Sequence, residues 1–481
     1  MIKSINDNRI KIFINKSERG YTKNFENAIN HSLGDFIFLC DQDDIWESEK
    51  IELVEKLFSK NKKGNLRMTL RYKIGCTICN QKYLMRISVG HSEKQSHIIE
   101  CNECKTNMSL ELLVNFQKVS STLNCIDNCE KIDFVDHGFE SNGEYIIRNL
   151  HPELLIPKEF ISDGVYNANV FEGGRLFEER KNKIGIIEEL NLKITKDFIS
   201  NLNRIERNWD ILKIAWKMKS NQQSHKLIEK QLQKYKSSTI KSDVEFDEIM
   251  FDFNNTILFP DFIDFTPNFS KYIREIFKNN NKMEEEYVKC IKYYKENLLS
   301  DNIKKFYDIY CDFFELYNDY KPFLTYITTS QEVNHESMVS SDNFEKTKMF
   351  YGKLFEAYTS NISFITMLHN IFKGRDFDQL ENISFENYLY SEKAARTENF
   401  KDTNKFNFFH EYIDSKLRNA SHHCNIEIKD NIITYKAGKH LKEYTMTYTK
   451  YLEMCTQLFL RFVILHQLQI LKYYTYLKYN R

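Results

Sequence analysis

Turn-forming residues are scarce in this chain. Among its 481 residues, only 5 are prolines and 14 are glycines. A fold made of many short strands needs more of these residues for its turns, so a turn-dense, all-β architecture is excluded. Aromatic residues make up 14% of the chain, enough to build large buried cores. The length allows roughly two to four domains, and we predict an α+β multidomain protein that is mainly α-helical.

The chain also lacks an excess of charge of either sign. It has 68 basic and 68 acidic residues, so no overall charge attracts it to nucleic acid or membrane. The first 20 residues are polar and charged, and we expect no secretory signal. The apolar stretch 458–471 contains Arg461 and His466, so we expect a buried helix and no membrane span. The 11 cysteines, several in metal-like pairs, suit a reducing cytoplasm.

An acidic cluster ends the apolar run GDFIFLCDQDDIW at residues 34–46. The apolar half has the character of a buried strand, and carboxylates at its end would lie where open α/β sheets bind ligands. Asp41 and Asp43, with Asp44 beside them, can share a divalent cation that neutralises a diphosphate. The alternative to a metal site is an acidic turn at the start of a solvated helix, where the same carboxylates would be favourable.

This part of the chain resembles family 2 glycosyltransferases of the kind that make bacterial surface polysaccharide. The resemblance rests on RGYTKNFENAI at 19–29 and on the acidic run after it. It implies a GT-A-type Asp-x-Asp motif in which Asp41 and Asp43, with Asp44 nearby, bind Mg or Mn. The strand and helix that hold the base in that family are missing, and no catalytic base follows. We therefore expect 1–59 to be a truncated fragment.

Cysteine pairs follow a charged linker. Two pairs have two intervening residues each and 21 residues between them: Cys76 with Cys79, and Cys101 with Cys104. Each pair can bind zinc from a tight turn, and together they complete a tetrahedron with no open position. With strand-like stretches and a hairpin expected between the pairs, 68–110 resembles a zinc ribbon with a structural zinc site. Two unrelated pairs are the alternative. Cys125 and Cys129 form a weaker pair, either a second site or incidental.

The predicted ribbon has a basic rim with interleaved tyrosines, which suits contact with a nucleic-acid backbone and equally a mixed solvated face. Its residues are Arg67, Arg71, Lys73, Lys82 and Arg86, with Tyr72 and Tyr83 between them. Turns and short strands predict a mixed α/β connector at 111–185. From 186 to 380, apolar residues recur at spacings of three and four, which predicts an α-helical domain. The clearest helical stretches are 190–219, 227–236 and 303–316.

The last informative segment is LRNASHH at 417–423, at the end of an amphipathic helical pattern. A hairpin turning at Asp430-Asn431 and a long apolar helix at 448–476 are predicted after it. This order makes 381–481 resemble HEPN domains, helical modules of prokaryotic toxins and abortive-infection systems. The resemblance implies a metal-independent endoribonuclease, formed across a homodimer, with three catalytic residues: Arg418, Asn419 and His423.

The chemistry of these side chains suits that family. An imidazole can move the proton of a ribose hydroxyl, and a guanidinium can hold the phosphate. A helix end at which the same side chains satisfy backbone carbonyls is the alternative.

Three functions follow from the sequence. The first is an HEPN-like RNA-cleaving or RNA-binding protein with a structural zinc ribbon, serving phage defence or toxin action. The second is a family 2 glycosyltransferase that transfers a sugar from a nucleotide sugar during surface polysaccharide synthesis. The third is a non-catalytic helical interaction protein.

Overall fold

The structure is a computed structural model, and it describes most of the chain from the first cysteine pair onward. The described residues are 69–90, 93–115, 120–132, 145–152, 188–236, 239–278, 280–337, 339, 344–422, 425–429, 432–438 and 442–479. The backbone alone is described at 69, 188–203, 344–345, 429 and 472–479.

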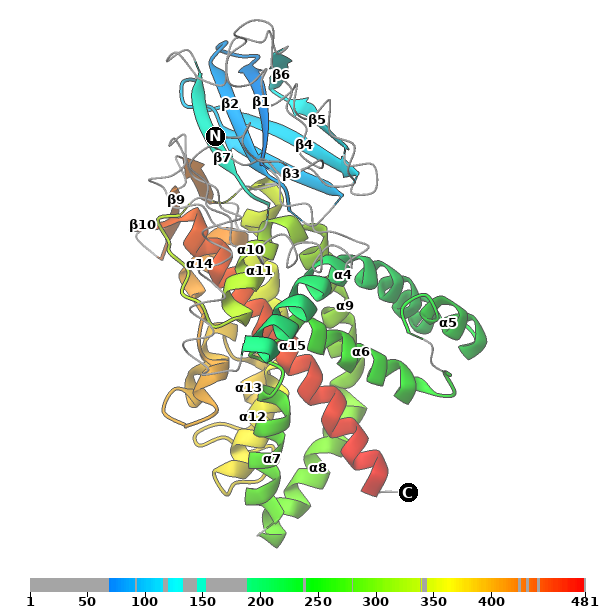
Figure 1. The fold of residues 1–481 in the computed structure, drawn as a ribbon. Coiled ribbons are helices and arrows are strands. Elements are labelled where there is room, and N and C mark those ends of the chain that lie inside the picture. Colours follow the sequence, from blue (N-terminus) through cyan, green and yellow to red (C-terminus); the bar gives the residue numbers. More distant parts are fainter. Residues whose placement is uncertain are drawn as a thin grey trace, which may run out of the picture. The chain divides into compact units, whose positions relative to one another are not determined.

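The described residues between 69 and 152 form a β-rich part, drawn in blue to cyan in Figure 1. Its strands are β1 (Thr69–Cys76), β2 (Lys82–Ser88), β3 (Lys94–Glu100), β4 (Asn107–Asn115), β5 (Ser120–Asp127), β6 (Cys129–Ile132) and β7 (Ile146–Leu150). One sheet has the order β6-β1-β2-β7 and the other β3-β4-β5. Strand β7 runs parallel to β2, whereas the other pairs are antiparallel.

Each cysteine pair lies in the turn of its own hairpin. Strands β1 and β2 pair up to Gly75↔Lys82, and β3 and β4 pair up to Glu100↔Asn107. The stretches between the cysteine pairs are strands, as predicted. The predicted hairpin between them is wrong, because β2 and β3 belong to different sheets and pair with different strands.

A small core joins these two sheets. In β4, Met108, Leu110 and Leu112 are buried at alternate positions, the period that places side chains on one face of a strand. Strand β2 lies between β1 and β7, and most of its side chains are buried. The buried side chains of both sheets form one hydrophobic cluster. The β-rich part therefore has a core of its own.

A helical body follows. Its helices are α4 (Glu188–Ser220), α5 (His225–Leu232), α6 (Asp243–Leu258), α7 (Phe265–Lys278), α8 (Asn281–Asn297), α9 (Leu299–Glu315), α10 (Tyr317–Thr328), α11 (Phe344–Asn361), α12 (Ser363–Phe372), α13 (Phe385–Tyr390), α14 (Ser415–His422) and α15 (Tyr448–Tyr479), with 3-10 turns η3 (Lys393–Phe400) and η4 (Asn407–Phe409). The helices predicted at 190–219, 227–236 and 303–316 are confirmed as α4, α5 and α9.

Side-chain caps start several of these helices. Ser242 and Glu245 form a reciprocal capping box at α6: the Ser242 backbone N–H donates to Glu245 at 2.8 Å. Asn280 accepts from the backbone N–H groups of Lys282 and Met283 at α8. These local caps satisfy backbone N–H groups in the first turns of α6 and α8.

A short sheet interrupts the helices between α14 and α15. Strand β8 (Ile426–Lys429) pairs antiparallel with β9 (Ile432–Ala437), and this confirms the predicted hairpin. Strand β10 (Lys442–Thr447), which the sequence did not predict, pairs with the other edge of β9.

Helix α15, red in Figure 1, is the central helix of the body. It packs against α6, α7, α8, α10 and α11. Phe313 of α9 stacks on Phe459 with ring centroids 3.6 Å apart, and Phe306 lies 4.6 Å from Phe462. A single hydrophobic cluster runs from Ile205 to Ile470, so the helices before and after residue 380 share one core.

The polar side chains of α15 are hydrogen-bonded inside this core. His466 Nδ1 lies 3.2 Å from Asn254 Nδ2, and the Tyr310 hydroxyl donates to Asn254 Oδ1 at 2.7 Å. Thr266 donates to Gln467 at 2.8 Å. Since a buried polar group without a partner costs about 1–3 kcal/mol, these bonds favour one register of α15 against α6 and α7.

Tyr448–Leu471 has the length and composition to cross a membrane, with a mean hydropathy of 1.3. However, 89% of its apolar window is buried against the protein. This agrees with the buried helix predicted there, because the core of a folded helical body supplies the same apolar surroundings.

We predict that His466 makes stability depend on pH. Burial, reinforced by Lys219, lowers the pKa of His466 to about 3, against about 6.5 in an unfolded chain. Below about pH 6.5 the unfolded chain therefore binds a proton at His466 that the folded chain does not. The free energy of unfolding then falls by up to ~1.4 kcal/mol for each pH unit, down to about pH 3. In urea titrations at about pH 7 and pH 5, His466→Gln should therefore show a shallower loss of stability than the wild-type chain.

Tryptophan fluorescence follows this transition, since the Trp216 ring stacks on His466 with ring centroids 5.5 Å apart. The matched control is His225→Gln, an exposed histidine at the start of α5. Equal pH slopes for the wild-type chain and His466→Gln would contradict the prediction.

Candidate functional site

The two cysteine turns have the same backbone geometry. The Cys76 N–H donates to the Gln81 carbonyl at 2.9 Å, and the Asn80 N–H donates back to the Cys76 carbonyl at 2.9 Å. In the second turn, Cys101 makes the equivalent bonds with Thr106 and Lys105 at 2.9 and 3.0 Å. Asn80 and Lys105 both adopt left-handed backbone angles, with φ of 63° and 62°. Each turn is therefore a knuckle that presents two sulfurs to one point.

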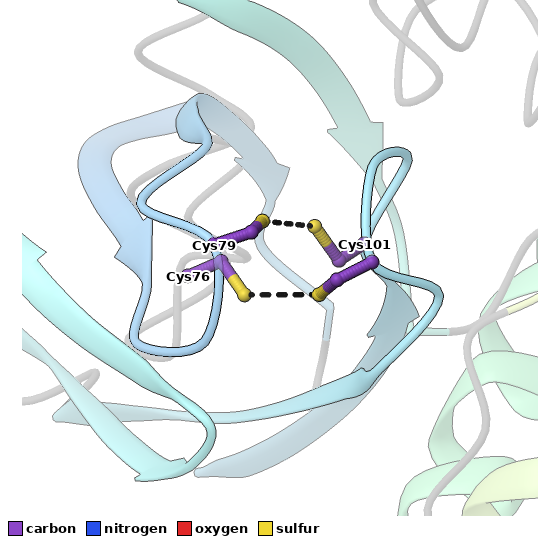
Figure 2. A group of neighbouring side chains, drawn as sticks. Cys76, Cys79 and Cys101 are labelled. Atoms are coloured by element: carbon purple, nitrogen blue, oxygen red, sulfur yellow. Dashed lines mark hydrogen bonds between the residues drawn. The ribbon is translucent and has the colours of Figure 1, made fainter.

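The sulfurs of both knuckles come together (Figure 2). Cys76 Sγ lies 3.6 Å from Cys104 Sγ, and Cys79 Sγ lies 3.5 Å from Cys101 Sγ. All of the sulfurs in this cluster lie within 4.8 Å of one another. Ligands about 2.3 Å from a tetrahedral zinc ion would be about 3.8 Å apart. A disulfide would need about 2.05 Å. The cluster thus has the size of a metal site.

Other side chains hold this cluster in place. The buried Tyr83 hydroxyl donates to Cys101 Sγ at 3.2 Å and accepts from the Asn102 N–H at 2.7 Å. Arg148 on β7 donates to the Asn102 side chain and lies over the Tyr83 ring. Hydrogen bonds of this kind orient metal ligands. Tyr83 and Arg86 are buried and do not form part of an exposed basic rim, whereas Arg71 is exposed, so nucleic-acid contact by that rim stays a prediction.

The thiols of this cluster suit metal binding. Hydrogen bonds from the side chain and backbone of Thr106 lower the pKa of Cys104 to about 6. This favours its thiolate, the form that binds a metal, whereas for Cys79 a backbone bond with Gln81 is outweighed by burial and the neighbouring sulfurs, which raise the pKa of Cys79 to about 12. Thiolates from both knuckles would fill a tetrahedral shell and leave no position for a substrate. The arrangement can hold an ion that joins the two hairpins, but it offers no place for catalysis at that ion.

The second candidate site lies at helix α14. Asp414 caps this helix, accepting from the backbone of Lys416 at 2.8 Å and of Leu417 at 3.0 Å. The helix packs closely on α11: Ser421 Oγ donates to the Lys348 carbonyl at 2.7 Å and accepts from the Gly352 N–H at 3.0 Å. A Cβ at Gly352 would lie 3.0 Å from Ser421 Oγ, so a larger residue would push the helices apart.

This packing places Arg418 beside Glu356 of α11. Arg418 Nε donates to Glu356 Oε1 at 2.6 Å, a second bond comes from Nη2, and Nη1 donates to Asn419 Oδ1 at 2.6 Å. Lys393 of η3 pairs with the other carboxylate oxygen. Burial works to raise the pKa of Glu356, but the bonds from Lys393 and Arg418 outweigh it and hold that pKa below its ordinary value.

The guanidinium of Arg418 is thereby held in a fixed position. Together, Arg418, Lys393 and Glu356 carry a net charge of +1. Arg418 is still 29% exposed. Of its five N–H bonds, three are used by Glu356 and Asn419 among the described residues. The remaining donors can face an anion such as a phosphate.

The other predicted site residues lie outside the described residues. This holds for His423, which follows the end of α14 directly, and for the acidic residues Asp41, Asp43 and Asp44. The structure thus brings together the cysteines of the predicted metal site, and it brings Arg418 next to Asn419. The sequence did not predict that Tyr83 supports the cysteine cluster or that Glu356 pairs with Arg418. Glu356 is 62 residues before Arg418 and has no local motif, so only the packing of α11 on α14 reveals it.

Comparison with known families identifies one segment. Residues 1–103 match the family model of glycosyl transferase family 2. The match covers about a fifth of the 481 residues and extends past residue 59, the predicted end of the truncated fragment. No curated protein and no solved structure matches the chain.

The match supports the glycosyltransferase resemblance of the N-terminal segment. Its described portion contains the antiparallel pair β1 and β2 and ends between Cys101 and Cys104. The HEPN-like interpretation of 381–481 gains no support from these comparisons and stays a prediction.

We predict that Cys101→Ser removes the metal from the cysteine cluster. A serine hydroxyl is a poor replacement for a thiolate, so the protein should lose most of its bound metal, and the β-rich part should unfold at a lower temperature. Metal analysis of the purified full chain measures the first effect, and calorimetry the second. The control is Cys311→Ser, because Cys311 lies on α9 outside the cluster. A metal content unchanged in Cys101→Ser would contradict the site.

Proposed function

We propose that this chain is a zinc-containing protein whose helical body cleaves or binds RNA in the manner of HEPN domains. The fixed guanidinium of Arg418 is the observation that carries the RNA function. The cysteine cluster supports zinc as the metal, since zinc suits a closed shell of soft thiolates. In this proposal the zinc is structural and takes no part in RNA chemistry.

Arg418 supports phosphate binding because its position is set before any ligand arrives. Glu356 and Asn419 hold the guanidinium from two sides, and its stem lies near Phe355, with 5.9 Å between the guanidinium carbon and the ring centre. A preorganised cation stabilises developing negative charge without first having to rearrange. Lys393 adds a second positive charge to the same site.

His423 supplies the proton transfer in this proposal. It is five residues after Arg418 in the sequence and directly follows the last residue of α14. An imidazole with a pKa near neutral can take the proton of the ribose 2′-hydroxyl or protonate the leaving oxygen. Since neither step needs a metal ion, the cleavage would proceed without added divalent cations.

A homodimer and a defence or toxin role complete the proposal. One Arg418 and one His423 make half of a site that can both bind phosphate and move two protons. Pairing two copies would bring two such sets together. Cleavage of host RNA would arrest growth, the outcome expected of a toxin or an abortive-infection protein.

We predict that Arg418→Ala and His423→Ala each lower RNA cleavage by at least about 100-fold, because each removes a group acting in the transition state. The assay uses a fluorescent single-stranded RNA, the metal-loaded full chain, and no added Mg²⁺ or chelator. The control is Lys416→Ala, a lysine on the same helix whose ammonium lies over the Tyr444 ring. Cleavage by both variants at the wild-type rate would overturn the RNA function.

The match over residues 1–103 favours a second candidate function, transfer of a sugar from a nucleotide sugar. In this alternative Asp41 and Asp43 hold Mg or Mn, the ion neutralises the diphosphate of the donor, and Asp44 assists nearby.

For this alternative we predict Mn²⁺-dependent turnover of a nucleotide sugar that Asp43→Ala abolishes. Product release from a panel of uridine and guanosine diphosphate sugars measures it. Glu52→Ala is the control, since it removes a carboxylate outside the motif. If no nucleotide sugar is bound or turned over by the wild-type chain, the glycosyltransferase alternative is ruled out.

A further inference from the structure

A second thiol pair lies at the corner between β5 and β6. Cys125 is near the end of β5, Cys129 begins β6, and Asn128 turns the chain between them with a left-handed φ of 55°. Interaction between the two thiols lowers the pKa of Cys125 and raises that of Cys129. Cys129 Sγ also donates to the Ser109 carbonyl at 3.4 Å. The corner therefore holds two thiols in contact that do not belong to the metal cluster.

The two thiols differ in exposure. Cys125 is half-buried and accessible to a small molecule, whereas Cys129 is buried, with 9% of its surface exposed. The backbone between them bulges, because Leu110 of β4 pairs with Cys125 and Ser109 pairs with Asp127. An accessible thiol next to a buried one is the arrangement in which the first reacts with an oxidant and the second resolves the product.

This corner is joined to the first metal knuckle. Strand β6 pairs with β1 so that Cys129 lies directly opposite Cys76. The Thr77 N–H, inside the knuckle, donates to the Asn128 carbonyl at 3.1 Å. The Asn128 side chain donates to the Asn107 carbonyl at 2.9 Å, beside the second hairpin turn. A shift of Asn128 would therefore move the backbone that presents Cys76.

We propose that Cys125 and Cys129 form a thiol–disulfide site that takes a low-molecular-weight disulfide as its oxidant. The Cys125 thiolate attacks one sulfur of the oxidant, which releases one thiolate and leaves a mixed disulfide on Cys125. The thiolate released by the oxidant takes up the proton of Cys129, whose sulfur attacks Cys125 and displaces the second thiolate, which takes a proton from solvent. Two electrons pass from the protein to the oxidant, which leaves as two thiols.

The same reaction affects how tightly the cysteine cluster holds its metal. Closing the disulfide draws Cys129 toward Cys125 and strains the Asn128 turn that supports the knuckle. The site therefore links the redox state of its surroundings to metal retention. The effect on metal retention rests on the metal function proposed above, whereas the formation of the disulfide is independent of it.

One peptide tests the disulfide directly. Trypsin cuts after Lys118 and Lys131 and releases VSSTLNCIDNCEK, which contains both cysteines. The metal-loaded full chain is treated with oxidised glutathione, its remaining thiols are alkylated, and the peptide is weighed by mass spectrometry. We expect the peptide to lose two hydrogen atoms and to take up no alkyl group. A chelator assay on native protein taken after the glutathione treatment and before alkylation should show metal release several-fold faster than from untreated protein.

Matched variants separate the two roles. Cys129→Ser should keep glutathione on Cys125 as a stable adduct, because the resolving thiol is gone. Cys125→Ser should show neither the disulfide nor faster metal release, and Cys311→Ser should behave as the wild-type chain. An unchanged peptide, or a stable glutathione adduct in the wild-type chain, would overturn the site. A disulfide without faster metal release would overturn its link to the cluster. A chain that holds no metal would refute the metal function and leave the peptide result standing.

Discussion

The helical body depends on the burial of α15. This helix is apolar along most of its length, yet it carries His466 and Gln467 into the core. Each of these polar groups has to find a partner, and the partners lie on α6, α7 and α9. The hydrophobic effect drives α15 into the body, while the hydrogen bonds select one register among the many that would bury similar apolar area.

The position of α15 also determines the position of α11, which carries Glu356 of the candidate RNA site. The Tyr451 hydroxyl of α15 donates to the Thr347 carbonyl of α11 at 2.7 Å, which fixes the start of α11 on the central helix. One turn later, Gly352 allows α14 to approach closely. About one turn further along the same two helices, Glu356 meets Arg418. The charged site is thus a consequence of how α14 packs on α11.

The β-rich part is organised differently. Its hydrophobic cluster is small compared with that of the helical body. Two hairpins belong to separate sheets, and their turns meet at the cysteines. An ion bound there would cross-link the two sheets at the point where Tyr83 and Arg148 of one sheet already form hydrogen bonds with the cysteine turn of the other. This explains why the same knuckle geometry occurs twice, and why Tyr83 is buried against the sulfurs, where its hydroxyl satisfies both Cys101 and Asn102.

Local pattern by itself determined the helices α4, α5 and α9, the β8–β9 hairpin and the pairing of Cys76 and Cys79 with Cys101 and Cys104. In each case the information lies within a few residues: apolar spacing sets a helical face, and two intervening residues set a knuckle. Only the tertiary structure decided that the cysteine pairs lie in separate hairpins, that β10 extends the small sheet, and that Glu356 holds Arg418. These features join residues far apart in the chain, and their partners are selected by the shape of the shared core, which no local spacing records.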